Sequence, residues 1–382
     1  MTTLLTPPIP APHAPPGVPG ARFPAVRHLG PQWYASVMGT AIVAGAGAAL
    51  PVRVPGLDTF CAVVWLLSAV LLLVLLTARG AHWVHHREQA RADLLNPGIA
   101  PFYGCLSMAL LAVGGASMTA GAPLVGRRAA LVTDAVLYSA GALTGLVVAV
   151  VVPYLMIVRH RPAPGTATPV WLLPLVAPMV AAALGPLLVA ELPAGQGRGA
   201  LLLACYGMFG LSLLATALVL PLVFARLVHT GPLPLALTPT LFLVLGPLGQ
   251  SVTAVNALAD VAPGAVGPPY ASAFGAAAVL YGVPVTGFAL LWLALATALV
   301  VRAAVDGMPF SMTWWGFTFP VGTCVTGASG LARHTGLDAF TWVAVALYAL
   351  LLAAWAVTGA RTVRGLLAGT LPAPPAPVAA AG

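Results

Sequence analysis

Charged side chains are scarce in this chain, and lysine is absent altogether. The 382 residues include 16 basic residues, all of them arginine, and 8 acidic ones, which together make up 6% of the sequence. A soluble globular domain carries about 25% charged residues. The mean hydropathy of +0.99 and the 60% share of hydrophobic residues agree with this contrast. The composition therefore excludes an ordinary soluble protein and indicates a membrane protein.

Arg, Asp and Glu are absent from ten long apolar stretches. These stretches are 33–52, 59–78, 99–121, 135–158, 170–190, 199–225, 235–259, 271–301, 311–332 and 339–360, each of 20 or more residues. About 20 residues at 1.5 Å rise cross a hydrocarbon layer roughly 30 Å thick. Backbone groups in lipid must pair internally, which favours helices here, since the short alternating strands of a barrel are missing. Because the connections are short, we predict an all-α polytopic membrane protein whose ten transmembrane helices form five helical hairpins.

The ends of the chain differ in composition from its centre. Residues 1–31 contain nine prolines and no apolar core segment, so we expect a disordered, Pro-rich tail rather than a cleavable signal. Residues 32–361 form the predicted ten-helix domain, and 362–382 form a second disordered tail. The longest connection is 79–98, where we predict an interfacial helix that Pro97 ends.

The arginines are distributed unevenly between the two sides of the predicted domain. With the N-terminus in the cytoplasm, 11 arginines lie on the inner side and 5 on the outer side. Positive residues favour the cytoplasmic side, so we place both termini in the cytoplasm of a multi-pass plasma-membrane protein. No basic cluster on a polar fold offers a surface to a nucleic acid. The expected surroundings are therefore the lipid bilayer, with no nucleic-acid partner.

Cysteine is rare, and histidine avoids the apolar stretches. The four cysteines form no CxxC pair and all lie in apolar stretches, where they are typical of small buried hydrophobes. His82, His85 and His86 have only Glu88 nearby as a further ligand, which favours a polar interfacial face over a metal site. We expect no metal and no cofactor. The stretches hold no His, Asp or Glu, which disfavours a proton relay and an intramembrane enzyme.

The segment 311–326 combines aromatic, small and hydroxylated residues around a proline. Its centre reads Trp314-Trp315-Gly316-Phe317-Thr318-Phe319-Pro320. Pro320 removes one intrahelical hydrogen bond and predicts a bend, which can turn the Phe319 ring into a lumen. The alternative is an aromatic ring packed between helices.

This segment resembles the ninth-helix signature of the tellurite-resistance/dicarboxylate transporter family, which includes slow-type anion channels, malic acid permeases and sulfite efflux pumps. Three further segments are similar to family motifs in the same order: 33–43, 96–108 and 246–251. Within the second, Cys105-Leu106-Ser107 departs from the small or Pro-containing stretch of the family. The departure leaves the subfamily and the substrate open.

The resemblance implies a fold, a gate and an assembly. It implies five helical hairpins around a central pore, a phenylalanine at position 319 that occludes the pore, and a homotrimer with one pore in each protomer. The residues expected to line the pore are Met38, Gly39, Thr40, Phe102, Gly104, Met108, Gly246, Pro247, Gln250, Ser251, Thr318, Pro320 and Thr323.

A pore without central charge suits weakly bound anions, because ions must also leave it. Thr40, Gln250, Ser251, Thr318 and Thr323 offer hydroxyl and amide groups, although each could instead bond a neighbouring helix. Arginines at the two mouths can raise the local anion concentration. We therefore expect an anion channel or transporter for small anions, either a C4-dicarboxylate such as malate, or sulfite or another inorganic anion. A proton- or exchange-coupled carrier is the alternative, and an intramembrane enzyme is the unlikely one.

Overall fold

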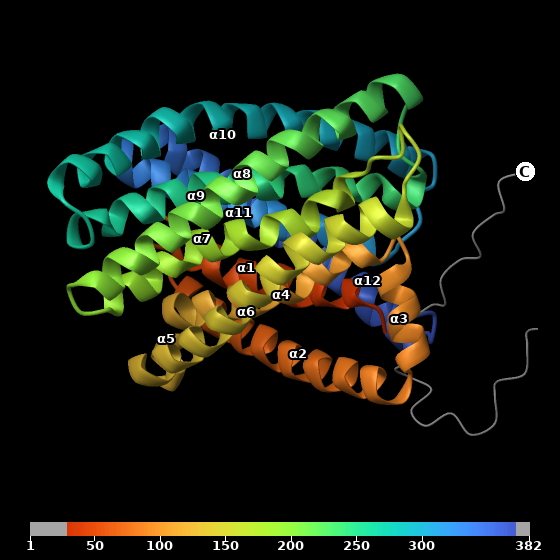
Figure 1. Ribbon diagram of the computed structural model, residues 1–382, viewed down its shortest axis with the longest axis horizontal. Coiled ribbons are helices and arrows are strands. Elements are labelled where there is room, and N and C mark those ends of the chain that lie inside the picture. Colours follow the sequence, from red (N-terminus) through yellow and green to blue (C-terminus); the bar gives the residue numbers. More distant parts are fainter. Residues whose placement is uncertain (1–28, 372–382) are drawn as a thin grey trace, which may run out of the picture.

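The computed structural model describes residues 29–371, and within that range every regular element is a helix (Figure 1). The ten longer helices are α1 (Tyr34–Ala48), α2 (Leu57–His85), α4 (Gly104–Ala116), α6 (Arg127–Leu155), α7 (Leu173–Glu191), α8 (Gln196–Thr230), α9 (Leu245–Val261), α10 (Pro268–Val305), α11 (Phe319–Thr335) and α12 (Asp338–Leu367). Two short helices, α3 (Arg87–Leu95) and α5 (Ala122–Val125), lie in connections.

Eight helical segments in the described part of the chain are long and apolar enough to cross a membrane. Their most apolar windows have mean hydropathies between 1.5 and 2.8. The other two long helices, α1 with 15 residues and α11 with 17, fall in the first and ninth predicted stretches but are shorter. The all-helical, polytopic membrane class is therefore confirmed. Ten complete crossings stay a prediction, because α1 and α11 are shorter than the roughly 20 residues that span a bilayer.

The helices form an inner and an outer set. Neighbours along the chain pack in pairs, α1 with α2, α4 with α6, α7 with α8, α9 with α10 and α11 with α12. The first helices of these pairs also contact one another in a closed ring, in the order α1, α4, α7, α9 and α11. In the spans containing α7 and α9, 83% of the most apolar window is buried, against 17–22% in those of α6, α8, α10 and α12. The outer set therefore presents the apolar surface that a membrane requires.

Small residues allow the inner helices to approach closely. A Cβ atom on Gly104 of α4 would clash with the carbonyl oxygen of Leu173 at the start of α7. A Cβ atom on Gly249 of α9 would lie 2.5 Å from the backbone nitrogen of Cys324 on α11. Lipid offers no hydrophobic drive for helix association, so such close backbone contacts carry much of the packing.

A short 3-10 helix precedes each of the five inner helices. These segments are Pro31–Trp33, Ala100–Tyr103, Pro169–Leu172, Leu235–Val244 and Met312–Phe317. The last ends just before Phe319, so Pro320 occupies the first turn of α11. The predicted mid-helix bend at Pro320 is wrong, since a proline in the first turn lacks only an N–H that would be unpaired anyway.

Several helices extend beyond the apolar stretches and include charged residues. In α6, Asp134 is fully buried rather than in an outer loop as its position in the sequence suggests, and no donor among the described residues reaches either carboxylate oxygen. At the end of α2, Arg79 is 4% exposed and pairs with Asp93 of α3 at 3.8 Å. Arg79 at the end of α2 thus finds a polar partner beyond the apolar stretch, whereas Asp134 is buried without one among the described residues.

The connection 79–98 is partly helical. The helix α3 ends at Leu95, just before Asn96-Pro97, and it lies across one end of the bundle (Figure 1). At the C-terminus, α12 continues to Leu367, so residues 362–367 of the predicted tail are helical. The predicted tail segments 1–28 and 372–382 lie outside the described residues.

Candidate functional site

Two cavities lie within the ring of inner helices. The larger has a volume of about 140 Å³ and is lined by residues of all five inner helices. The smaller has a volume of about 10 Å³ and is also lined by residues of all five helices or of the 3-10 segments that lead into them. A cavity needs roughly 10–15 Å³ to hold one water molecule. The smaller space is therefore a constriction, whereas the larger can hold several small molecules.

The five inner helices run in the same direction. In each, an early position lines the constriction and a later one lines the larger cavity: Met38 and Gly45, Met108 and Gly115, Val176 and Ala183, Gly246 and Asn256, and Phe319 and Arg333. The two cavities are therefore successive parts of one path along the ring axis. The N-termini of the helices surround its narrow end, and the C-termini surround its wide end.

Phe319 stands between the two cavities. Among the described residues it is the one whose side chain lines both, and it is only 2% exposed. Its position is set by the turn before it, where the Thr318 hydroxyl donates to the Trp315 carbonyl oxygen at 2.7 Å. The Trp315 indole N–H in turn donates to the Thr362 hydroxyl of α12 at 3.1 Å. The Phe319 ring thus separates the two cavities in this structure.

The constriction beside Phe319 is apolar. Met38 of α1 and Met108 of α4 are each 1% exposed and meet Phe319 there. Gly246 of α9 lines the same space, and a Cβ atom on it would meet nothing within 4 Å. An apolar space at the limit of one water molecule cannot hydrate an ion.

The larger cavity combines small apolar residues with a polar strip from α9 and α11. Thr253 and Thr326 face each other with their hydroxyl oxygens 2.6 Å apart. Gln250 and Asn256 are 3% and 1% exposed, and each has an amide oxygen that no donor among the described residues reaches. Buried amides normally find partners. These two therefore mark places where water or a ligand completes the hydrogen bonding.

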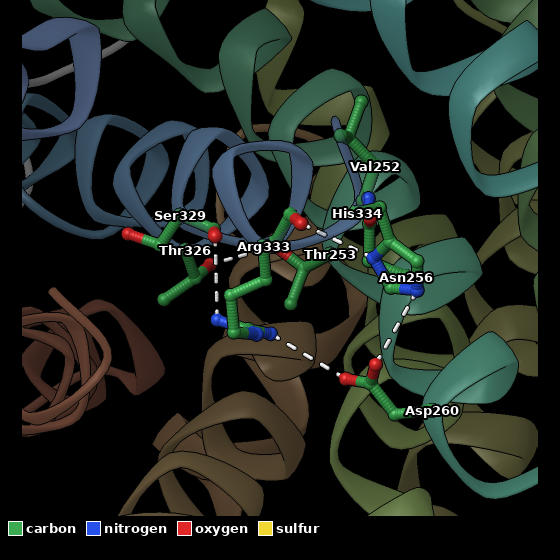
Figure 2. A network of polar contacts seen from close by, with 9 residues as sticks. Val252, Thr253, Asn256, Asp260, Thr326, Ser329, Arg333 and His334 are labelled. Carbon is green, nitrogen blue, oxygen red and sulfur yellow. Dashed lines mark hydrogen bonds and ion pairs between the residues drawn. The ribbon is translucent and has the colours of Figure 1, made fainter. Parts of the chain in front are cut away.

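A network of polar contacts lies at the wide end of the cavity (Figure 2). Arg333 on α11 lines the cavity, and its Nη2 lies 3.4 Å from Oδ2 of Asp260 on α9. The other carboxylate oxygen, Oδ1, lies 3.3 Å from Nε2 of His334. Figure 2 shows Arg333 and His334 reaching Asp260 from its two sides. Arg333 is the one charged residue among the described residues that line either cavity.

The structure brings six of the predicted site residues to the two cavities. Phe319 lines both, Gln250 lines the larger, and the constriction is lined by Met38, Met108, Gly246 and Pro320. The other eight line neither cavity: Gly39, Thr40, Phe102, Gly104, Pro247, Ser251, Thr318 and Thr323.

Hydrogen bonds account for several of those eight. The Thr40 hydroxyl accepts from the Trp355 indole at 3.1 Å, and the Ser251 hydroxyl accepts from Tyr281 at 2.9 Å, both on outer helices. Thr323 donates to the Leu245 carbonyl oxygen of α9 at 3.3 Å. Gly39 and Gly104 lie where helices touch. For Thr40, Ser251 and Thr323 the helix-bonding alternative therefore describes the structure, and their part in transport stays a prediction.

Sequence reasoning missed five polar residues of the larger cavity: Thr119, Thr253, Asn256, Thr326 and Arg333. A signal for the last two exists, because positions 319, 326 and 333 are seven apart and two helical turns bring such positions to one face.

In the described part of the chain, no group of three His, Cys, Asp or Glu residues could hold a metal ion.

Comparison with known proteins places the chain among membrane transporters. The family model described as voltage-dependent anion channel matches residues 28–363. A sulfite efflux pump of Arthroderma otae is 27% identical over 345 residues, which cover 89% of this chain and 91% of the relative. A sulfite efflux pump of Trichophyton rubrum is 26% identical over the same shares. An uncharacterized transporter of Methanocaldococcus jannaschii is 23% identical over 91% of this chain and 96% of its own length. These matches confirm the resemblance carried by the four sequence motifs.

Proposed function

The chain belongs to the voltage-dependent anion channel family, and we propose that it moves small inorganic anions, sulfite first among them, along the axis of the inner ring. The observation that carries this proposal is the pair of successive cavities inside the ring, lined by all five inner helices and separated by Phe319. We propose sulfite rather than malate because relatives that align with 89% of this chain are named as sulfite efflux pumps. Phe319 is the proposed gate.

The electrostatics of the path support an anion as its cargo. A helix N-terminus carries about half a positive charge, and the five inner helices direct theirs toward the narrow end. At the wide end, where the C-termini carry the opposite partial charge, Arg333 lines the cavity. No carboxylate lines either cavity among the described residues. Both ends of the path thus hold groups that attract anions.

The membrane arrangement is part of the proposal. We place the narrow end of the path at the cytoplasm and the wide end outside, with both termini in the cytoplasm and ten crossings of the plasma membrane. The 11-to-5 distribution of arginines supports this orientation. The homotrimer, with one path in each protomer, rests on the family resemblance, and the mass of the detergent-solubilised particle tests it.

A proton-coupled carrier is the second candidate, and one observation favours it. Asp134 is fully buried in α6, and neither of its carboxylate oxygens has a donor among the described residues. Ionisable groups at such depth are often functional. Against this role, Asp134 lines neither cavity and lies behind α4, close to Gly114.

Flux measurements in proteoliposomes test the proposed function. Purified protein should release trapped sulfite faster than protein-free vesicles do, with malate and chloride as competitors and potassium as the cation control. Single-channel currents far above about 10³ ions per second would exclude ordinary carrier turnover. A current carried by cations, or sulfite release no faster than from empty vesicles, would contradict the proposal.

A further inference from the structure

Arg333 has an unusual set of neighbours for a residue in the wall of a transport cavity. Its Nη1 donates to the Ser329 carbonyl oxygen at 3.3 Å, and its Nη2 meets Asp260 at 3.4 Å. The side chain is still 49% exposed. A guanidinium has five N–H donors, so these long contacts leave part of its hydrogen-bonding capacity for a further acceptor.

Two buried amides lie along the same cavity. Asn256 is one helical turn before Asp260 on α9, and its Nδ2 donates to the Val252 carbonyl oxygen at 2.8 Å. Its Oδ1 and the Oε1 of Gln250 have no donor among the described residues. Gln250 lies ten residues before Asp260 on α9, about 15 Å along the helix axis, so one small anion bound by Arg333 reaches the Asn256 amide and not that of Gln250. The Asn256 amide can therefore hydrogen-bond a hydrated or partly protonated anion that the guanidinium holds.

Asp260 already occupies one side of that guanidinium. It is 44% exposed, and its second oxygen is held by His334 at 3.3 Å. The carboxylate is thus an anion fixed to the protein and bound to the group that would otherwise bind an incoming anion. Displacing it is feasible, because a half-exposed ion pair with a long contact contributes little.

We propose that Arg333, with the amide of Asn256, forms an oxyanion-binding site at the wide end of the cavity, where Asp260 competes with the incoming anion. This inference rests on the proposed function and adds the residues that set affinity and specificity. The planar fork of arginine donates two parallel hydrogen bonds to two oxygens of one anion. A halide offers a single centre, on which the two N–H groups must converge, so its two hydrogen bonds are bent and weaker. The site therefore favours sulfite over chloride.

The test is the concentration dependence of flux in proteoliposomes with protein in one orientation, with anion supplied to the wide end. Arg333→Gln should raise the half-saturating sulfite concentration by about tenfold. Asp260→Asn should lower it by up to about fivefold, since an exposed pair contributes no more than that. Misfolded protein cannot produce such a gain. Arg333→Lys keeps the charge but loses the planar fork. It should therefore raise the half-saturating concentration for sulfite and leave that for chloride unchanged.

Matched controls come from the exposed pair between Arg127 of α6 and Glu191 of α7, which lines neither cavity. Arg127→Gln removes the same charge as Arg333→Gln, and Glu191→Gln removes the same charge as Asp260→Asn. Both controls should leave the half-saturating sulfite concentration within about twofold of the parent value. If these controls shift the half-saturating sulfite concentration as much as the Arg333 and Asp260 variants do, surface potential explains the effect and the site is refuted. If the parent protein transports sulfite but Asp260→Asn leaves the half-saturating concentration unchanged, the binding site is refuted and the proposed function stands. If the parent protein transports no sulfite, the proposed function and the site are both refuted.

Discussion

Removing the ring of Phe319 should open the path. The ring is 2% exposed and forms the wall shared by the cavity of about 140 Å³ and the constriction of about 10 Å³. Phe319→Ala joins the two spaces and admits water to the narrow part. Stripping an ion of its hydration costs several kcal/mol even after the protein relaxes. Each 1.36 kcal/mol recovered at the barrier is tenfold in rate, so we expect anion flux to rise at least tenfold.

The same substitution has an opposing effect on stability. Phe→Ala in a packed core costs roughly 3–5 kcal/mol. Flux must therefore be normalised to correctly assembled protein, measured by size-exclusion chromatography and thermal unfolding in detergent. Phe319→Leu keeps an apolar side chain in the path, and we expect its flux to stay closer to that of the parent than to that of the alanine variant.

Phe317 provides the matched control for the gate. Its ring packs edge-on against Phe242, with centroids 4.9 Å apart, and against Trp314 at 5.7 Å. It lines neither cavity, so Phe317→Ala removes the same atoms without widening the path. Sulfite release and single-channel conductance should rise for Phe319→Ala only. Equal gains from both variants, or a loss of flux from well-assembled Phe319→Ala, would show that Phe319 is a packing residue.

Three further outcomes are expected. Reporter fusions should place both termini in the cytoplasm and the turn at Gly126 outside, and an odd number of crossings between the termini would contradict the ten-helix arrangement. Asp134→Asn should leave sulfite flux within about twofold and independent of a pH gradient, because Asp134 lies behind the cavity wall; loss of gradient-driven uptake would favour the carrier. Gly104→Val should lower the unfolding temperature in detergent, since a side chain there meets the Leu173 backbone, and unchanged stability would contradict the close α4–α7 contact.

The sequence predicted the membrane class because charge is scarce everywhere in it. A run of 20 apolar residues has few structural alternatives in lipid, so the ten stretches, 235 of the 382 residues, could be assigned to helices from composition and length. Helix ends were less predictable. The helix α6 begins at Arg127, whereas the apolar stretch begins at 135. The stretch reports hydrophobicity, while the helix ends where backbone hydrogen bonding ends.

The candidate gate could also be inferred from the sequence, although only through the resemblance of its segment to a family motif. Phe317 and Phe319 belong to the same segment, and composition does not tell them apart. The structure places one ring between the two cavities and the other against Phe242.

Only the tertiary structure decided which polar residues face the path. In a soluble helix, the alternation of polar and apolar residues shows which side is buried. In a membrane, lipid and protein interior are both apolar, so the same pattern says little about which face of a helix points toward the path. Thr40 and Ser251 therefore could not be distinguished in advance from Thr253 and Asn256. The pairing of Arg333 with Asp260, 73 residues apart, likewise exists only because α9 and α11 pack side by side.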